Sequence, residues 1–429
     1  MKTAAVSSSP NAKQVDAAIE KHWQRNTGLF LAAQNFFLFG SSSVFFAILW
    51  YIALKTSSGT WMMLATLAQS LPQILVSLWA GVWADRSNRR NLLMWATGMV
   101  TVVTLGIALM FYFGWRDLWL LLLIAAVRSM GTGIEMPVGN ALLPQLTPRG
   151  QLTRMNGLNQ LINAVLLLVT PIVSGLILGK LGIIFIFVVD VVTAATGVLL
   201  LGLIQVDHVV LDQQKATAGV VTSTLSQIGG GLKFTFNHSF MRWFMILIAL
   251  AFIMVAPSSQ LSTLFVKQTF GSRVILLTLN ELLWTAGATI GGIWISSHKQ
   301  INHKVRVIAT AMAVSGVAFF AMGIPEPFAV YLFFMFISGI AMPIIQATSN
   351  ILIQETVPSN MMGRVFSIFQ IVSTGIYPIA MLFFGPLADV VAIKWLFMAT
   401  GVLLVGVAWW FNATLTRLEP ATGVDAKTD

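Results

Sequence analysis

Long apolar stretches recur along the chain from Leu29 to Phe411, with short polar breaks between them. We count twelve such stretches, and each is close to the ~20 residues that a helix needs to cross about 30 Å of hydrocarbon. Hydrophobic residues make up 57% of the chain and charged residues only 9%, so one water-soluble core cannot bury the apolar surface. The sequence therefore predicts an all-α polytopic membrane protein.

The distribution of Lys and Arg predicts the orientation of these spans. An even number of spans places both termini on one side. If that side is the cytoplasm, eighteen of the 25 Lys and Arg residues lie inside, six lie outside, and Arg128 lies within the membrane, as the positive-inside rule requires. We therefore expect a multi-pass protein of a bacterial-type cell (inner) membrane with both termini in the cytoplasm. The net charge of +10 then reflects topology and contact with anionic lipids, and nucleic-acid binding is not expected.

A long polar interval divides the spans into two sets of six. The predicted organisation is a cytoplasmic N-terminal segment, a six-helix bundle, a cytoplasmic linker, a second six-helix bundle and a cytoplasmic tail, at residues 1–27, 28–204, 205–239, 240–412 and 413–429. The halves also share a register. A shift of 210 residues superposes three first-half residues on the same residue types: Asn140, Pro148 and Arg154 on Asn350, Pro358 and Arg364. This register indicates an internal duplication.

The loop after the second span has a distinctive composition, Gly-Val-Trp-Ala-Asp-Arg-Ser-Asn-Arg-Arg at residues 81–90. Gly81 lets its helix approach a neighbour closely. The carboxylate of Asp85 can pair with helix N-termini or cations, and Arg86 and Arg90 suit the cytoplasmic headgroup zone. The positive-inside rule alone would explain the arginines but not Gly81 or Asp85.

This loop resembles the signature between the second and third helices of the major facilitator superfamily. Asn88 stands where the family commonly has Gly, a mild departure because Asn tolerates the left-handed conformation. The resemblance implies a secondary transporter of two parallel six-helix halves with a substrate cavity between them. It also implies that gating on the cytoplasmic side involves Gly81, Asp85, Arg86 and Arg90.

Arg128 lies inside the fourth span, in Val-Arg-Ser-Met-Gly-Thr-Gly, and Glu135 follows seven residues later on nearly the same helix face. Charges in the hydrocarbon zone are costly unless they face protein or water. The run resembles the fourth-helix pattern of drug and proton antiporters, which implies a role in proton transfer. Arg128 can stabilise a nearby carboxylate when close and release it when distant. The alternative is a static ion pair that only fixes helix packing.

Two further acids lie within predicted spans, Asp190 in the sixth and Glu281 in the eighth. Each is roughly 12 Å from the outer end of its helix, so both are candidates for one cavity. Such an acid can carry protons or attract a cationic substrate, or it can be a protonated structural group. The candidates for proton coupling are therefore Glu135, Glu281, Asp190 and Arg128.

Polar side chains within otherwise apolar helices are candidates for the substrate cavity. They can bind substrate, or they can only allow tight packing. The pairs occur in the first, fifth and tenth spans, as Gln34 with Asn35, Gln160 with Asn163, and Gln346 with Asn350. At residues 168–175 the fifth span only weakly resembles an antiporter pattern, because Thr170 and Ser174 replace two glycines. The direction of transport stays open at this point.

Two stretches resemble the drug and proton antiporter branch that includes macrolide efflux and siderophore export proteins: Gln-Asn-Phe-Phe-Leu-Phe-Gly-Ser in the first span and Asn-Ala-Leu-Leu-Pro-Gln-Leu-Thr-Pro after the fourth. The resemblance implies multidrug efflux, with amphipathic or other lipophilic small molecules exchanged for protons by a monomer in contact with membrane lipids. The alternatives are a dedicated exporter of one metabolite, siderophore or lipid-like compound, and a membrane sensor that moves nothing. No enzyme, cofactor or metal motif is present in the sequence.

Overall fold

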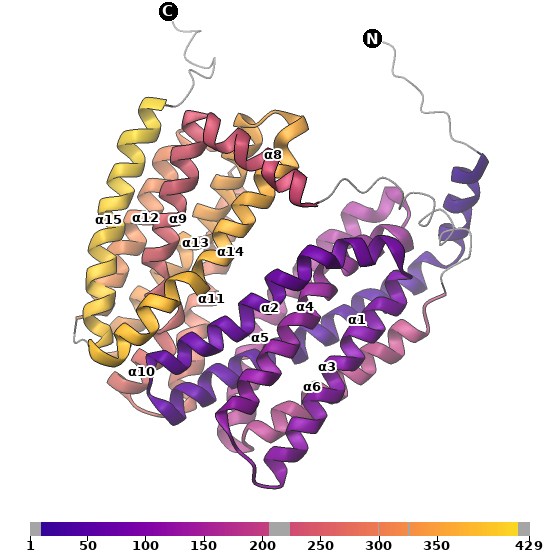
Figure 1. The fold of residues 1–429 in the computed structure, drawn as a ribbon, viewed down its shortest axis with the longest axis horizontal. Coiled ribbons are helices and arrows are strands. Elements are labelled where there is room, and N and C mark those ends of the chain that lie inside the picture. The colour runs from indigo at the N-terminus through magenta and orange to yellow at the C-terminus, as the bar shows by residue number, and fades with distance from the viewer. Residues whose placement is uncertain (1–9, 206–223, 299, 325–326, 419–429) are drawn as a thin grey trace, which may run out of the picture. The chain divides into compact units, whose positions relative to one another are not determined.

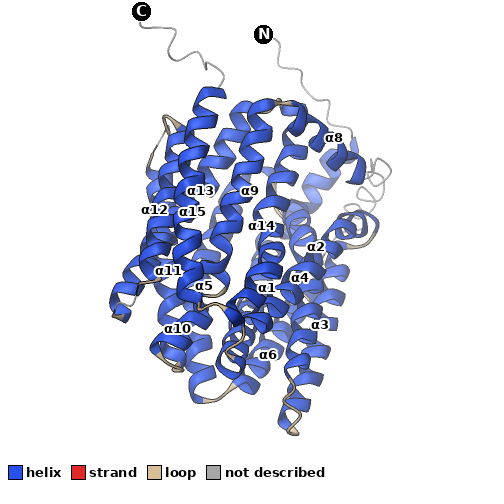
Figure 2. Cartoon of the chain, turned by 60° about the vertical axis from the view of Figure 1, so that its left-hand side comes forward, coloured by secondary structure: helices blue, strands red, loops and turns tan. Residues whose placement is uncertain are grey.

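The structure is a computed structural model that describes residues 10–205, 224–298, 300–324 and 327–418. Within these ranges all regular structure is helical and no strand occurs (Figure 2). The contacts divide the chain into two compact units, one of Met1–Ile48 with Ala68–Val221 and one of Leu49–Leu67 with Thr222–Asp429. Most of the predicted linker, at 206–223, and most of the predicted tail, at 419–429, lie outside the described residues.

In its described part, the first unit has six long helices and one short 3₁₀ turn (Figure 1): α1 (Pro10–Thr56) up to Ile48, α2 (Gly59–Arg86) from Ala68, α3 (Arg89–Tyr112), α4 (Leu118–Leu146), η1 (Arg149–Gln151), α5 (Leu152–Lys180) and α6 (Ile183–Gly202). At one end of this unit a buried core joins helices that are far apart in sequence. It includes Phe30 of α1, Leu93 of α3, Leu142 of α4 and Leu201 of α6. This core fixes the helices that carry the charged residues of the site.

The second unit contains eight further helices: α8 (Thr224–Asn237), α9 (Ser239–Gln260), α10 (Ser262–Phe270), α11 (Val274–Ser297), α12 (Lys304–Met322), α13 (Phe328–Thr356), α14 (Ser359–Val390) and α15 (Ile393–Leu418). It also holds the last turns of α1 and the first turns of α2, within Leu49–Leu67. Buried aromatic rings join α9, α14 and α15, since the ring centroid of Phe244 lies 6.2 Å from that of Phe369 and 6.0 Å from that of Phe411.

Glycines allow α11 and α13 to cross closely. A Cβ atom on Gly287 would lie 2.1 Å from the carbonyl oxygen of Phe336, and one on Gly339 would lie 2.3 Å from that of Trp284. Neither position can carry a side chain unless the helices separate. Small residues at a crossing are a usual way to pack helices in membranes, where dispersion contacts replace the hydrophobic driving force.

Among the described residues, eleven helical segments are long and apolar enough to cross a membrane. The segment Ser239–Phe270 combines α9 and α10 in one of these spans, as the sequence predicted. The remaining predicted span, 60–84, corresponds to α2, which is outside the set of eleven. α2 is described only in part, because several of its side chains between 78 and 86 lie outside the described residues. Its described interior contains Gln69, Pro72 and Gln73. Two of these residues prove to line a cavity.

Candidate functional site

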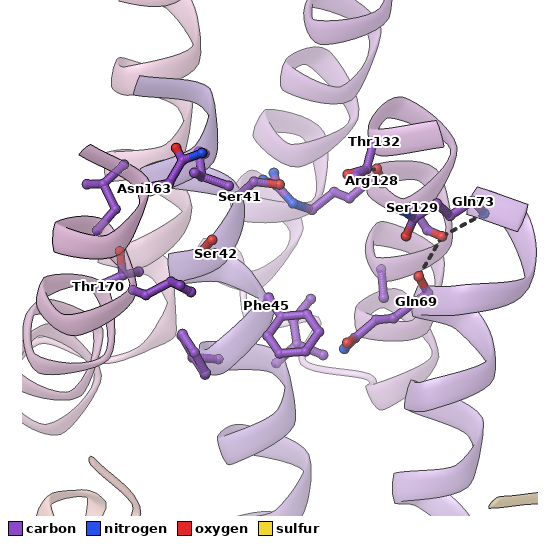
Figure 3. A pocket seen from close by; sticks show the side chains of 16 residues that line it. Ser41, Ser42, Phe45, Gln69, Gln73, Arg128, Ser129, Thr132, Asn163 and Thr170 are labelled. Carbon is purple, nitrogen blue, oxygen red and sulfur yellow. Dashed lines mark hydrogen bonds between the residues drawn. The ribbon is translucent and has the colours of Figure 1, made fainter. Parts of the chain in front are cut away.

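A cavity of about 350 Å³ lies within the first unit, among α1, α2, α4 and α5 (Figure 3). Its volume is in the range of small-molecule sites. The apolar part of the lining includes Phe45, Leu166 and Leu167. The polar part consists of Ser41, Ser42, Gln69, Gln73, Arg128, Ser129, Thr132, Asn163 and Thr170. A cavity with both kinds of lining suits a molecule that has an apolar body and a few polar groups.

Arg128 forms a bidentate ion pair with Asp190. Its guanidinium donates to Oδ2 of Asp190 at 2.5 Å and to Oδ1 at 3.0 Å. A third N–H contact reaches Oγ1 of Thr104 at 3.4 Å. The exposed fractions of Arg128 and Asp190 are only 9% and 2%, so the pair is largely removed from solvent, yet Arg128 still lines the cavity. A parallel two-bond geometry is the strongest way to hold a carboxylate.

The position of Asp190 depends on close packing of α1 against α6. A Cβ atom on Gly40 would lie 2.3 Å from Oγ1 of Thr193 and 2.6 Å from Oδ1 of Asp190. Only a residue without a side chain leaves room for the carboxylate at this place. Gly40 of α1 therefore helps to position an acid of α6 opposite the arginine of α4.

The two glycines after Arg128 have a similar steric role. A Cβ atom on Gly131 would lie 2.6 Å from Cγ2 of Val100 in α3, and one on Gly133 would lie 2.8 Å from the carbonyl oxygen of Gln73 in α2. The spacing of the fourth-helix motif is thus explained by packing, because α4 touches α3 with one glycine and α2 with the other. This packing holds Arg128 at a fixed depth between its neighbours.

Glu135 does not pair with Arg128, although the two lie on nearly the same face of α4. Its Oε1 accepts a hydrogen bond of 2.8 Å from the hydroxyl of Thr97 in α3. Glu135 is nevertheless close enough for the charges of Arg128 and Asp190 to act on it. The first unit therefore gathers one cation and two carboxyl groups into one electrostatic cluster.

Ser129 joins α4 to the cavity wall formed by α2. Its hydroxyl donates to the carbonyl oxygen of Gln69 at 2.7 Å and accepts from the backbone N–H of Gln73 at 2.9 Å (Figure 3). These two groups of α2 are four residues apart, the spacing of one hydrogen bond of the helix ladder. The hydroxyl of Ser129 therefore bonds both ends of one turn of α2, beside Pro72. The carboxamides of Gln69 and Gln73 both line the cavity.

Some polar atoms in the cavity wall have no hydrogen-bond partner among the described residues. They are Nε2 of Gln69 and Oγ1 of Thr170, and both are buried. Leaving a buried donor or acceptor unpaired costs about 1–3 kcal/mol. These two atoms, one from α2 and one from α5, therefore carry hydrogen-bonding capacity that the described residues leave unused.

The predicted substrate-binding residues of the first unit occupy different positions. Asn163 lines the cavity, whereas Gln34, Asn35 and Gln160 are not part of its lining. The amide of Asn35 donates to the carbonyl oxygen of Leu31 in its own helix at 2.6 Å. Gln34 packs near Gly139 of α4, with Nε2 3.7 Å from where a Cβ would be. Gln160 is exposed on α5.

The remaining predicted residues, Gln346, Asn350 and Glu281, belong to the second unit. All three are partly buried. The carboxyl group of Glu281 forms no hydrogen bond or ion pair with the residues that the structure describes. Beside it, the buried amide of Asn280 accepts a hydrogen bond of 2.8 Å from the hydroxyl of Tyr331. Glu281 thus belongs to a different unit from the cluster of Arg128, Asp190 and Glu135. Its role in proton coupling stays a prediction.

The predicted gating loop is described in part. Gly81, Asp85 and Arg86 lie at the end of α2, and their side chains are outside the described set. The guanidinium of Arg90 donates to two carbonyl oxygens at the end of α6, that of Ile204 at 2.7 Å and that of Gly202 at 3.2 Å. Carbonyl groups at a helix C-terminus lack partners within the helix, so Arg90 both satisfies and neutralises that end.

Asn88 differs from the sequence-based expectation. Its backbone is extended, with φ −62° and ψ 111°, and its side chain caps α3 by accepting from the N–H groups of Arg90 and Asn91. Asn at this place is therefore explained by N-cap chemistry and not by tolerance of the left-handed conformation.

Sequence reasoning missed several lining residues, although signals were present. Ser129 and Thr132 lie one and four residues after Arg128, which places them on or near its helix face. Gln69 and Gln73 are four residues apart in an apolar helix, the spacing of one polar stripe. Within the described residues no cluster of three or more His, Cys, Asp or Glu residues could hold a metal ion.

The fold and the site together define a polytopic helical membrane protein with a ligand-sized cavity and a buried ion pair in its wall, which is the architecture of a transporter. The sequence model of the Major Facilitator Superfamily matches residues 30–377. The chain belongs to this superfamily, and it is a transporter and not an enzyme.

Relatives with efflux names match most of the chain at low identity. "Macrolide efflux protein A" from Streptococcus pyogenes is 21% identical over 389 residues, which cover 90% of this chain and 95% of the relative. "Multidrug efflux pump Tap" from Mycobacterium bovis is 21% identical over 366 residues, with coverages of 83% and 85%.

Solved structures share the fold. A crystal structure of a variant of the nucleoside transporter NupG has a TM-score of 0.69 at 12% identity and covers 95% of this chain and 100% of its own. The structure of a bacterial homologue of the iron transporter ferroportin has a TM-score of 0.67 at 15% identity, with coverages of 92% and 98%. At such identities the likeness concerns the fold alone.

Proposed function

We propose that the chain exports amphipathic or other small lipophilic molecules in exchange for protons, by alternating access. The observation that carries this proposal is the bidentate pair of Arg128 and Asp190, of which Arg128 lines the cavity. A charged pair at membrane depth is costly to keep. Here the pair lies next to the space in which a substrate fits. A change in the charge of the pair would therefore change its electrostatic interaction with the bound molecule.

Protonation of Asp190 is the coupling step. A proton added to one carboxylate oxygen removes the negative charge that holds the guanidinium, so Arg128 is released toward the cavity that it already lines. When the proton leaves, the two N–H···O bonds form again. Glu135 supplies a second carboxyl group on which the charges of Arg128 and Asp190 act.

The cavity lining supports an amphipathic substrate. Phe45 and Leu167 offer apolar contacts, while Gln73 and Asn163 are among the residues that supply polar groups to the lining. Sites with a mostly apolar wall and a few fixed polar groups select for shape and orientation more than for one chemical structure. The relatives named as macrolide and multidrug efflux proteins point in the same direction.

The remaining assignments follow from charge. Both termini are assigned to the cytoplasm, because eighteen of the 25 Lys and Arg residues then lie on that side. Gly81, Asp85, Arg86 and Arg90 are assigned to a cytoplasmic gate, in which Arg90 is bonded to the end of α6 in the conformation described. The protein is taken to act as a monomer in contact with anionic lipids.

Drug susceptibility tests this proposal in a bacterial host that lacks its own efflux pumps. The arms are empty vector, wild type, Asp190→Asn, Glu135→Gln and, as a matched acid control, Glu355→Gln at equal expression. Glu355 is a half-exposed acid of the second unit that pairs with Lys304 at 2.9 Å. We expect the wild type and the control to raise tolerance to several unrelated lipophilic compounds severalfold, and both site variants to lose this effect.

Other outcomes would count against the proposal. Tolerance to no compound, together with saturable transport of a single metabolite, would support a dedicated exporter. Tolerance that survives both site variants would remove proton coupling from this cluster and leave Glu281 as the candidate. Absence of any transport by purified protein in vesicles would favour a sensor.

A further inference from the structure

A second cavity, of about 430 Å³, is formed in the second unit by α11, α12 and α13. It is lined almost entirely by apolar side chains, among them those of Val314 and Ile337. The lining of α12 extends from Arg306 to Val314, or about 12 Å at 1.5 Å per residue. The groove is therefore shorter than half of the ~30 Å hydrocarbon core and begins at the interfacial end of α12.

One charged side chain lies at that end. Arg306 is the third residue of α12 and is exposed, and it forms no ion pair with the side chains that the structure describes. The neighbouring cation, Lys304, is already paired with Glu355 at 2.9 Å. The groove thus has an apolar body and one uncompensated positive charge at its mouth.

The opposite wall of the mouth is aromatic. Trp294, near the end of α11, is 41% exposed. Its ring centroid lies 4.4 Å from that of His298, and its carbonyl oxygen lies 2.8 Å from Nδ1 of the same residue. Tryptophan at the end of a membrane helix is characteristic of the headgroup level. Arg306 and Trp294 therefore mark the depth at which lipid headgroups meet acyl chains.

We propose that this groove is a binding site for an anionic phospholipid, with the phosphate on Arg306 and one acyl chain along Thr310, Val314 and Ile337. The groove matches such a lipid in two respects. It is apolar along the proposed path of the acyl chain and positively charged at the proposed position of the phosphate. With the predicted orientation, the mouth faces the cytoplasmic leaflet, where anionic lipids are attracted to basic residues. The groove shares no lining residue with the cavity of the first unit, and it rests on the proposed function only for the orientation of the chain.

Fluorescence quenching tests the lipid site in full-length protein in nanodiscs. Two sets of phosphatidylcholine nanodiscs are prepared. One contains a small fraction of phosphatidylglycerol with brominated acyl chains, and the other contains an equal fraction of brominated phosphatidylcholine. The chain has 14 tryptophans, so the signal of Trp294 is obtained as the difference between wild type and Trp294→Phe. We expect brominated phosphatidylglycerol to quench this signal at an about fivefold lower fraction than brominated phosphatidylcholine, which corresponds to about 1 kcal/mol for one basic residue.

Variants distinguish the contribution of the Arg306 charge to lipid binding from that of the apolar groove. Arg306→Ala should abolish the preference and Arg306→Lys should keep most of it. Arg417→Ala, which removes another exposed arginine at a helix end, should change nothing. Thr310→Phe fills the groove and should reduce quenching by either lipid even though Arg306 remains. Size-exclusion profiles check that each variant is folded.

Two results would overturn the proposal. Equal quenching by both brominated lipids would mean that the groove does not select an anionic headgroup. Loss of the preference on addition of inorganic phosphate, at constant ionic strength, would mean that Arg306 binds a free anion and not a lipid.

Discussion

The guanidinium of Arg128 binds both carboxylate oxygens of Asp190, 62 residues further along the chain, at 2.5 and 3.0 Å. The pair joins α4 to α6, and one of its members also forms part of a cavity wall. A buried ion pair is often no more stable than an apolar replacement, but removal of one partner leaves a charge without compensation. The effect of the pair on stability and its effect on transport can thus be measured separately.

Removal of one partner of the pair should destabilise the protein strongly. We expect Asp190→Ala to lower the free energy of unfolding by about 3–5 kcal/mol, because the charge of Arg128 stays buried. The double change Arg128→Met with Asp190→Leu should recover most of this loss, while transport stays absent in both variants. Thermal unfolding and vesicle transport measure the two effects. A double variant as unstable as the single one would show that the pair itself, and not its broken half, stabilises the fold.

Substitution of Gly40 should disturb the same pair through packing. A methyl group at Gly40 would overlap Oδ1 of Asp190 and Oγ1 of Thr193, and overpacking of this kind costs about 1–3 kcal/mol. Gly98→Ala in α3 is the matched control, because a Cβ atom on Gly98 would meet nothing within 4 Å. We expect Gly40→Ala to lower the melting temperature and transport, and Gly98→Ala to be neutral or stabilising by about 0.5–1 kcal/mol. Equal effects of both changes would contradict the packing argument.

Ser129 should matter more than its size suggests, since its hydroxyl bonds two backbone groups of α2. Ser129→Ala leaves the carbonyl of Gln69 and the N–H of Gln73 without this partner, at a cost of about 1–3 kcal/mol. Ser77→Ala, which removes only a bond to Ile74 within the same helix, is the control. Thermal unfolding with and without substrate compares the variants. If Ser129→Ala is as stable as the control, α2 closes its own ladder and the bridge is dispensable.

The sequence predicted the span pattern and family of this chain, but only part of the site. Burial of Arg128 required a partner, yet Glu135, Asp190 and Glu281 were all available on sequence grounds. The choice depends on which helices touch. α3 packs against both α4 and α6, so Thr97 of α3 bonds Glu135, and the long side chain of Arg128 reaches Asp190 of α6. The helical period predicts on which face of its helix a residue lies. It does not predict which other helix packs against that face.

Cavity residues were harder to predict than charged ones, for a similar reason. Asn163 and Gln160 are three residues apart in α5, but only Asn163 lines the cavity. Polarity within an apolar helix is equally compatible with a bond to the helix's own backbone, as Asn35 shows. Gln69 and Thr170 carry the unpaired atoms, and only contact geometry distinguishes them from satisfied polar residues.

Asp389, which had no role in the sequence argument, holds the start of α2 in the second unit. Its carboxylate accepts from the backbone N–H groups of Gly59 at 2.6 Å and Thr60 at 3.0 Å, and from the hydroxyls of Ser58 and Thr60. Ser57, which directly precedes Ser58, has a left-handed backbone with φ 54°. A charged cap from another helix therefore fixes a tight turn between α1 and α2.

Loss of this cap should loosen the turn locally. We expect Asp389→Ala to lower the free energy of unfolding by about 0.5–2 kcal/mol, and Asp389→Asn to cost less because it keeps an acceptor oxygen. Asp117→Ala is the matched control, since Asp117 is the N-cap of α4 but forms no capping side-chain bond. Amide hydrogen exchange of peptides that cover residues 58–62 should accelerate in Asp389→Ala and not in the control. Unchanged exchange there would mean that the turn is held by its own backbone, with the carboxylate only a spectator.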